Sequence, residues 1–234
     1  MDLLDRLADK PSLAAVLLDV DGVLAPIVPR PEDARVPDET RRELTRLHER
    51  YGLVGCISGR AGVDARRVVG VDSLTYVGNH GLELIPEATD WAERLHAFLA
   101  EVDWPRIEDK TLTATLHYRG MPDEEARMAL DSVAERARAE GFVARYGRKV
   151  LELLPPLEAD KGSAVQALLE LHGLGRALYA GDDTTDLDAF RALDGLELGV
   201  RVAVSSDEGP ADLRAAADVV VGGPAEFVEL LARL

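Results

Sequence analysis

The strongest constraint on the fold is an alternation of short apolar runs with charged segments of helical spacing. The run Ala14 to Val20 is nearly continuous in apolar residues, and a second run extends from Leu53 to Ile57. Between them, Leu44, Leu47 and Tyr51 recur at the spacing of one helix face. Continuous apolar runs are typical of strands that are covered by helices on both faces of a parallel sheet. We therefore predict an α/β fold with a doubly wound, Rossmann-like parallel sheet.

The same alternation continues after the second run. A weaker helix is expected from about Val63 to Val69, and a strand from Leu74 to Val77. Beyond Pro155-Pro156 the pattern resumes with a helix that carries Val165 and Leu168 on one face. The elements expected after that helix are the strand ALYAGD, a helix near 187–193, strands around 196–204 and 219–221, and a closing helix over 224–234.

The segment between about Ile85 and Pro156 follows another pattern. From Thr111 to Arg119 the residues alternate strictly between apolar and polar, which predicts a half-exposed antiparallel strand. The order helix, two strands, helix, two strands predicts a small α/β layer of its own, with Gly147-Arg148 as a hairpin turn. We expect a core domain formed by 1–85 and 157–234, and an inserted α/β cap domain at 86–156. The other elements expected in the cap are helices over 91–99 and 123–140 and strands over 142–146 and 150–154.

Composition excludes several classes of function. The chain of 234 residues has 27 Lys and Arg against 43 Asp and Glu, a formal charge of −16, which disfavours nucleic acids and anionic membranes as partners. No stretch is long and apolar enough to span a bilayer. The single cysteine, Cys56, cannot form an internal disulfide and is expected to be a buried thiol. We expect a cytoplasmic protein, and its oligomeric state stays open, with a monomer compatible with the sequence.

Polar residues finish the predicted core strands, and ligands of open α/β sheets bind beyond the carboxyl ends of strands. The first run ends in DVDG, where Asp19 and Asp21 are two residues apart on an extended backbone and point the same way. The second run ends in Ser58-Gly59-Arg60, a hydroxyl with nearby backbone N–H groups that suits an anion. Lys161 opens a later helix after Asp160, where the helix dipole also favours a phosphate. These residues are expected to face one site.

The late strand ends in GDDTTD, which adds Asp182, Asp183 and Asp186. Carboxylates gathered at one sheet edge repel one another unless a cation lies among them, and oxygen ligands on short loops favour Mg²⁺. A cation, Lys161 and the Ser58 loop could neutralise a transferring phosphoryl group. One carboxylate could then attack phosphorus, and a second could donate a proton to the leaving alcohol and later activate water. Any single Asp at a strand end is more often a turn or cap residue, but the ordered set predicts phosphoryl transfer.

Four motifs carry a family resemblance. DVDGVL, ISGR, the helix-opening lysine of ADKG, and GDDTTD resemble the motifs of the haloacid dehalogenase superfamily of aspartate-nucleophile phosphatases. Within it, DGVLAPIVPRPEDA, YVGNHGLEL, IEDKTLTATLHYR and LELLPPLEADKG resemble trehalose-6-phosphate phosphatases, with a cap between the second and third motifs. The resemblance implies a Mg²⁺-dependent phosphoric monoester hydrolase of trehalose biosynthesis that releases phosphate from trehalose 6-phosphate through an aspartyl-phosphate.

The resemblance also implies roles for individual residues. It makes Asp19 the nucleophile and Asp21 the acid/base. Mg²⁺ is expected on the Asp19 carboxylate, the Asp21 carbonyl and Asp182, with Asp183 or Asp186 supporting through water. The residues expected to bind the phosphoryl group are Ser58, Gly59 and Lys161. The residues expected to contact the sugar are Arg60, Asn79, His80, Glu108, Lys110, Arg119 and Glu152.

Some features leave alternatives open. Arg119 and His117 could belong to a solvated sheet face, and His80 could be a simple turn residue. Val23 departs from the residue that is usual in the subfamily, but the wider superfamily admits valine there. Leu154 and Leu187 also depart from the usual residues, so the substrate could be another glycosyl or pseudo-sugar phosphate, such as a sucrose or glucosylglycerol phosphate. Alternatives of another class are a phospho-aspartate receiver and a non-catalytic sugar-phosphate sensor, although a receiver needs neither an acid at Asp21 nor a cap.

Overall fold

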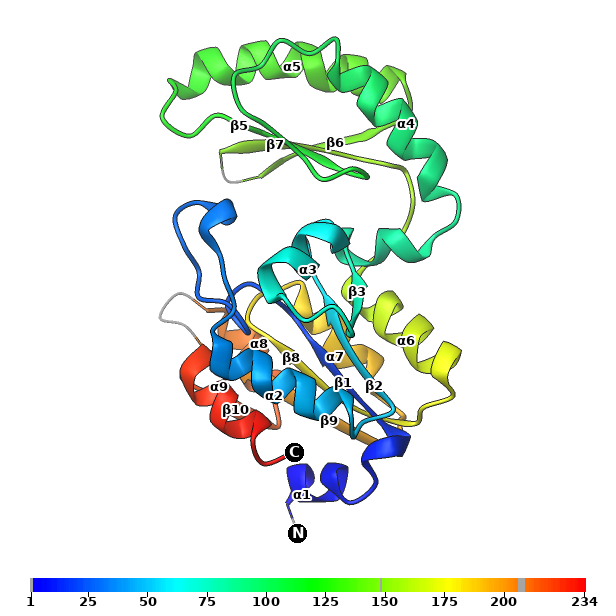
Figure 1. The fold of residues 1–234 in the computed structure, drawn as a ribbon. Coiled ribbons are helices and arrows are strands. Elements are labelled where there is room, and N and C mark those ends of the chain that lie inside the picture. The colour runs from blue at the N-terminus through cyan, green and yellow to red at the C-terminus, as the bar shows by residue number, and fades with distance from the viewer. Residues whose placement is uncertain (1, 148, 206–208) are drawn as a thin grey trace. The chain divides into compact units, whose positions relative to one another are not determined.

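The structure, a computed structural model, describes residues 2–147, 149–205 and 209–234. The chain divides into two compact units, shown as a ribbon in Figure 1. One unit contains Met1–Leu84 and Ala159–Leu234, and the other contains Ile85–Glu158. The expected domain boundaries were 85/86 and 156/157. Each unit has its own sheet and its own hydrophobic core.

The first unit is built on a six-stranded sheet in the order β10-β9-β8-β1-β2-β3, and every described pairing in it is parallel. The first strand, β1, lies in the middle of the sheet. The strands β2 and β3 follow on one side of it, and β8, β9 and β10 follow on the other side. The order reverses between β1 and β8, which places a topological switch point between these two strands. The strands are β1 (Ala14–Leu18), β2 (Leu53–Ile57), β3 (Thr75–Val77), β8 (Arg176–Gly181), β9 (Leu198–Val204) and β10 (Val219–Val221).

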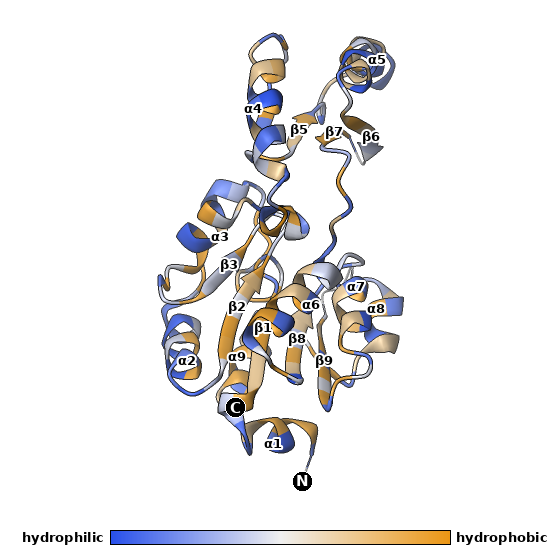
Figure 2. Cartoon of the chain, turned by 90° about the vertical axis from the view of Figure 1, so that its right-hand side faces the viewer, coloured by the Kyte–Doolittle hydropathy of each residue, from blue (hydrophilic) through white to orange (hydrophobic). Residues whose placement is uncertain are grey.

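Helices cover both faces of this sheet because the central strands are apolar on both sides, as the hydropathy colours of β1, β2 and β8 show (Figure 2). Val16 and Leu18 pack with the helices of one face, whereas Ala15 and Leu17 pack with those of the other. The fold class predicted from the sequence is therefore confirmed. The helices of the first face are α1 (Leu3–Ala8), α2 (Asp38–His48), α3 (Gly62–Val69) and α9 (Pro224–Leu231), and those of the second are α6 (Lys161–His172), α7 (Asp186–Ala192) and α8 (Ala211–Ala216).

The inserted unit is a four-stranded antiparallel sheet in the order β4-β5-β7-β6, with two helices packed on one of its faces. Leu116 and Leu151 lie side by side in the sheet and are buried with Leu95 and Leu130 of the two helices. The other face of the sheet carries polar side chains. The elements are α4 (Ala88–Leu99), β4 (Ile107–Asp109), β5 (Ala114–His117), α5 (Asp123–Ala139), β6 (Val143–Gly147) and β7 (Val150–Leu154).

Several elements differ from the sequence prediction. The strand expected over 111–119 is shorter, because Thr111 has a left-handed backbone (φ 72°) and ends a tight turn from β4 in which Lys110 N–H donates to Thr113 O at 2.9 Å. Thr115, expected on the exposed face, is buried. Gly147 pairs with Val150 across the β6–β7 hairpin, but Arg148 of the predicted turn lies outside the described residues. The short elements α1, α8 and β4 were not assigned from the sequence.

No helix in the described part of the chain is both long enough and apolar enough to cross a membrane.

Cys56 lies in β2 with no exposed surface and packs among the residues of the α2 and α3 layer. Burial raises the pKa of the Cys56 thiol, and the nearby Asp19 carboxylate raises it further. Because thiols react as thiolates, we expect no reaction of the folded protein with Ellman's reagent at pH 8, and one thiol per chain in guanidinium chloride. Rapid labelling of the folded protein would contradict the burial of this strand.

Candidate active site

The carboxyl ends of β1 and β8 bring together three carboxylates. Asp19 directly follows β1, Asp182 directly follows β8, and the two strands are neighbours, with Asp19 N–H donating to Ala180 O at 2.9 Å. Asp186, the first residue of α7, completes the group. One oxygen of each carboxylate lies within 4.8 Å of the others. The first and last of these residues, Asp19 and Asp186, are 167 positions apart in the sequence. The fold therefore brings distant carboxylates together at the switch point of the sheet.

Asp186 is fully buried and is the centre of a hydrogen-bond network. Its Oδ1 accepts from Tyr179 Oη and pairs with Lys161 Nζ, both at 2.7 Å. Its Oδ2 accepts from the backbone N–H groups of Asp182 and Asp183, both at 2.9 Å. Burial raises the pKa of the Tyr179 hydroxyl, as does Asp186, so this hydroxyl stays a donor. Asp186 thus fixes the GDDTTD loop on which Asp182 is carried.

Lys161 is the first residue of α6 and is almost completely buried. The helix starts there because Asp160 forms a capping box with Ser163, with Asp160 Oδ1 accepting from Ser163 N–H at 2.7 Å. Lys161 Nζ lies 2.7 Å from Asp19 Oδ2 and 2.7 Å from Asp186 Oδ1. Burial lowers the pKa of the Lys161 ammonium, but Asp19 and Asp186 outweigh it and the net direction is upward. One cation therefore stands between two buried carboxylates.

The three carboxylates fit a divalent cation. Burial and the neighbouring Asp19 and Asp186 carboxylates together raise the pKa of Asp182 to about 8, with burial as the largest cause. The pKa of Asp19 is also raised, first by burial and then by Asp186, although Lys161 opposes the shift. The single ammonium group of Lys161 does not balance the charge of three carboxylates, so negative charge remains in excess at this point. Oxygen-only ligands of this kind suit Mg²⁺ or a similar hard ion.

Gly22 makes room for the Asp182 carboxylate. A Cβ added at Gly22 would lie 2.0 Å from Asp182 Oδ2, and its backbone is left-handed with φ 78°. We expect Gly22→Ala to displace Asp182, to cost more than the ~1–2 kcal/mol that a left-handed backbone alone imposes on alanine, and to weaken cation binding. Thermal melting with and without Mg²⁺ checks this result.

Gly173 provides the matched control for that substitution. It is also left-handed, with φ 64°, but a Cβ there would meet nothing within 4 Å. Gly173→Ala should therefore show the backbone cost only and keep the full Mg²⁺-dependent rise in melting temperature. Equal effects of the two substitutions on that rise would contradict the crowding of Asp182 at Gly22.

The loop after β2 forms the second side of the site. Ser58 is buried, and its Oγ accepts from Arg60 N–H at 3.2 Å. Arg60 Nε and Nη2 both donate to the Asp21 carboxylate at 2.7 Å. Because Asp21 follows β1 and Arg60 follows β2, this pair joins the ends of two neighbouring strands. Asp21 points to Arg60 rather than into the carboxylate group of Asp19.

A strained turn supports the same loop. Asn79 and His80 have left-handed backbones, with φ 51° and 55°. The turn is held because Asn79 N–H donates to Arg60 O at 2.8 Å and His80 N–H donates to Ser58 O at 2.9 Å. A Cβ at Gly59 would lie 2.7 Å from His80 Nε2, so the imidazole packs on the glycine of the loop. The structure thus brings these two predicted sugar-contact residues to the Ser58 loop.

Asp183 is the member of the acidic motif that lies outside the carboxylate group. Its Oδ1 accepts from Thr184 N–H at 2.6 Å, so this side chain caps its own loop. Its part in metal binding stays a prediction from the family resemblance.

Two of the predicted sugar-contact residues of the inserted unit, Glu108 and Glu152, lie on the polar face of its sheet. Thr115 pairs with Glu108 on one side and with Glu152 on the other, so both carboxylates stand in one row across β4, β5 and β7. Glu108 lies 2.9 Å from His117 Nε2 and 3.8 Å from Lys110 Nζ. Glu152 accepts from Arg145 Nε at 2.8 Å. The structure therefore groups Glu108, Lys110 and Glu152.

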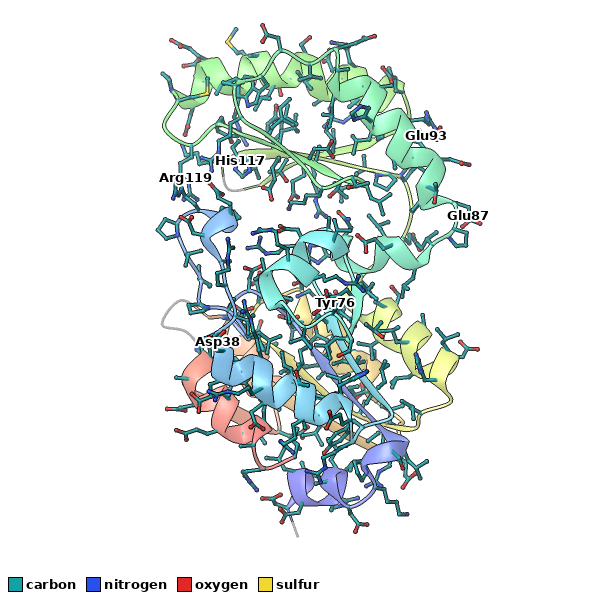
Figure 3. All side chains as sticks on the ribbon, viewed as in Figure 1. Asp38, Tyr76, Glu87, Glu93, His117 and Arg119 are labelled. Carbon is teal, nitrogen blue, oxygen red and sulfur yellow. The ribbon has the colours of Figure 1, made fainter. Side chains whose placement is uncertain are left out.

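Arg119 lies beyond the end of β5 and is exposed. Figure 3 labels this residue together with His117 in the inserted unit. Its role in substrate binding stays a prediction.

Sequence reasoning did not identify several residues that shape the site. Gly22 stands inside the motif DVDGVL, and Tyr179 lies in the predicted strand ALYAGD, where a hydroxyl within an apolar run was a signal. Glu83 accepts from Gly62 N–H at 2.8 Å and from Gly78 N–H at 2.9 Å, and so ties the strained turn to α3. No local pattern distinguished Glu83 from a surface carboxylate.

Known proteins are similar to this chain in sequence and in fold. The trehalose-phosphatase family matches residues 17–219. A trehalose-phosphate phosphatase of Mycobacterium avium is 32% identical, over 94% of this chain and 61% of the relative. An uncharacterized glycosyl hydrolase of Mycobacterium tuberculosis is 33% identical, over 94% of this chain but only 18% of the relative. The chain thus spans less than two thirds of the length of these curated relatives.

The C-terminal domain of a Candida albicans trehalose-6-phosphate phosphatase has a similar structure, with a TM-score of 0.68 and 21% identity, over 98% of this chain and 94% of that domain. The likeness shows the same fold, a parallel core sheet with an inserted α/β unit. The family match extends across the core and the inserted unit, and it shows that the chain belongs to the trehalose-phosphatase family.

Proposed function

We propose that the protein hydrolyses trehalose 6-phosphate to trehalose and inorganic phosphate through a phosphorylated Asp19. The observation that carries the proposal is the position of Asp19 at the carboxyl end of β1, with Lys161 Nζ at 2.7 Å and Asp182 beside it. A carboxylate with a buried cation at hand can approach a phosphate dianion, which an isolated carboxylate would repel. The family match supports the substrate.

In the first half-reaction an Asp19 oxygen attacks phosphorus and forms the new P–O bond. The P–O bond to the sugar breaks, its electron pair stays on the sugar oxygen, and that oxygen takes a proton from the Asp21 carboxyl group. Lys161 orients Asp19 and neutralises charge on the transferring group. The Ser58 hydroxyl, next to Arg60 N–H, offers a further hydrogen bond to a phosphate oxygen. Asp21 leaves this step as a carboxylate.

In the second half-reaction a water molecule attacks phosphorus. Asp21 takes the proton from this water, the P–O bond to Asp19 breaks, and the Asp19 carboxylate is restored together with inorganic phosphate. Asp21 ends protonated, as it began, so the net reaction consumes one water and releases one alcohol. Both half-reactions use the same two carboxyl groups.

Asp19, Asp182 and the Asp21 carbonyl would hold a Mg²⁺ ion, with Asp186 fixing the loop that carries Asp182. Mg²⁺ bound there would supply Lewis-acid stabilisation of the charge on the phosphate oxygens. The excess of carboxylate over ammonium charge at this point supports this assignment.

The polar face of the inserted sheet supplies the sugar specificity in this proposal. Carboxylates with a neighbouring ammonium group and imidazole are groups that bind sugar hydroxyls, and Glu108 lies beside both Lys110 and His117. If this face is only solvated surface, it should not affect the reaction. We expect Glu108→Gln to raise KM for trehalose 6-phosphate and to leave hydrolysis of p-nitrophenyl phosphate unchanged. Glu93→Gln on the exposed side of α4 is the control, and equal KM values for both variants would contradict a sugar-binding role (Figure 3).

Phosphate release with Mg²⁺ from a panel of substrates tests the proposed function. We expect the highest kcat/KM for trehalose 6-phosphate, at least about 10²-fold above glucose 6-phosphate, because a site built for two rings leaves polar groups unpaired when one ring is missing. Preference for a sucrose or glucosylglycerol phosphate would favour that related substrate instead. Release of phosphate from no sugar phosphate would contradict a catalytic function and favour a receiver or a sensor.

A cytoplasmic location belongs to the same proposal. It is supported by the single buried thiol, which needs no oxidising compartment. The strongly acidic composition disfavours a nucleic-acid partner. It does not prevent binding of a small anionic substrate, because charges are screened within about 8 Å at physiological salt and the cations at the site determine the local attraction.

A further inference from the structure

Asp21 is one end of a chain of four charged side chains in the first unit. Arg60 donates to both Asp21 oxygens at 2.7 Å, and its remaining terminal nitrogen, Nη1, donates to Asp64 Oδ2 at 2.7 Å. The other oxygen of Asp64 accepts from Arg67 Nη2 and Nε at 2.7 and 2.9 Å. Positive and negative groups alternate along the chain Asp21–Arg60–Asp64–Arg67. The carboxylates therefore hold Arg60 from two sides.

The guanidinium group of Arg60 has little freedom to move. Its side chain is only 11% exposed. The backbone of Arg60 is fixed as well, because its N–H donates to Ser58 Oγ and its carbonyl accepts from Asn79 N–H. Asp64 lies in the first turn of α3, a rigid element that packs on the sheet through Ala65 and Val68. Asp64 thus supplies an anchor on a helix for a side chain that begins on a loop.

A fork of two hydrogen bonds fixes the plane of a carboxyl group, which a single bond does not. Each carboxylate oxygen has two lone pairs, and the fork uses one on each oxygen. Asp21 therefore keeps a free lone pair on each oxygen for the proton that it gives to the sugar oxygen and takes from water. The fork determines the direction in which this proton moves.

We propose that Asp64 is a positioning residue that acts through Arg60 to orient the acid/base Asp21. This inference rests on the proposed function and extends it to a residue outside the four motifs. It also gives Arg60 a different role from the sugar contact that the sequence resemblance implies. A sugar-binding Arg60 would serve one substrate, whereas a positioning Arg60 would serve every reaction in which the leaving group needs a proton.

The first readout compares a leaving group that needs a proton with one that does not. The sugar oxygen of trehalose 6-phosphate must be protonated as it leaves, but p-nitrophenolate is stable without a proton. We expect Asp64→Asn to lower kcat/KM by about 10-fold or more for trehalose 6-phosphate and by less than about 3-fold for p-nitrophenyl phosphate, a part of the 10²–10⁴ that general acid catalysis contributes. Arg67→Gln is the matched control, because it removes the other partner of Asp64 and leaves the Arg60 contacts in place.

A double-mutant cycle with Asp21→Asn provides the second readout, and it separates positioning of Asp21 from sugar binding by Arg60, whose loss would persist in the Asp21→Asn background. If Asp64 acts through Asp21, Asp64→Asn should have less than about a 2-fold effect on either substrate once Asp21 is replaced. The p-nitrophenyl phosphate rate of each variant reports on its folding, so a loss of structure lowers both substrates together. Equal losses with both substrates, or an undiminished loss in the Asp21→Asn background, would overturn the inference. A wild-type protein that hydrolyses neither substrate would instead overturn the proposed function and this inference with it.

Discussion

Asp19→Asn is expected to lower kcat for phosphate release by about 10⁴-fold or more, because the amide cannot form an acyl phosphate and no second carboxylate replaces it. Asp21 is held by Arg60, and Asp186 is enclosed by Lys161 and Tyr179, so neither can reach the position of Asp19. The measurement is steady-state phosphate release with trehalose 6-phosphate and p-nitrophenyl phosphate. Asp38→Asn, an exposed carboxylate on α2, is the control and should keep wild-type rates (Figure 3).

The same substitution should not destabilise the protein. The pKa of Asp19 is raised on folding by burial and by Asp186, so its contribution to stability is present below its unfolded pKa and is lost as the pH rises through the folded value. At pH 8 without divalent cations, Asp19→Asn should melt at the same temperature as the wild type or higher, and the difference should shrink below pH 7 and disappear only near the unfolded pKa of 3.8. A large fall in melting temperature at pH 8 would indicate a structural role for Asp19 instead.

Lys161→Met is expected to abolish activity and to lower the free energy of unfolding by about 3–5 kcal/mol at pH 8. Removal of one partner of a buried ion pair leaves uncompensated charge, and here two carboxylates, Asp19 and Asp186, would be stranded together. Urea unfolding measures the loss. Lys10→Met, an exposed lysine in the same unit, provides the control and should change the free energy by less than about 0.5 kcal/mol.

The pH dependence identifies the cause of that loss. Without the ammonium group, the folded pKa of Asp19 would rise further, so stability would be retained at low pH and lost as the pH increases. The deficit of Lys161→Met relative to the wild type should therefore be smaller at pH 5 than at pH 8. A deficit that does not change with pH would point to lost packing of the lysine stem rather than to stranded charge.

The core sheet could be predicted because local sequence determines its strands. The bounds predicted for β2 and β7 are those of the structure, since each apolar run is bordered by turn or charged residues. The helix start at Lys161 was also readable, because Asp160 and Ser163 form the cap within four residues. In contrast, β4 has three residues with one large apolar side chain, and its pairing with β5 stabilises it. Such an element has no periodicity to detect.

The candidate site also has features that the sequence predicted and features that it could not predict. Topology alone predicted that the ends of β1 and β8 would meet, and the structure joins Asp19, Asp182 and Lys161 there. The Arg60–Asp21 fork could not be predicted, because it joins side chains 39 residues apart whose rotamers depend on the packed loop. The sequence also did not distinguish Asp183 from Asp186. Hydrogen bonds made only in the fold enclose one and leave the other at the loop surface.

The most direct test of the account is to find the phosphoryl group on Asp19. The Asp21→Asn variant, mixed with p-nitrophenyl phosphate and Mg²⁺ and quenched in acid, should accumulate one phosphoryl group per chain, because formation needs no acid there and hydrolysis lacks its base. Peptide mass spectrometry should place that group on Asp19, and hydroxylamine should remove it. Release of nitrophenolate without a modified Asp19 peptide, or with the phosphoryl group on another residue, would contradict the account.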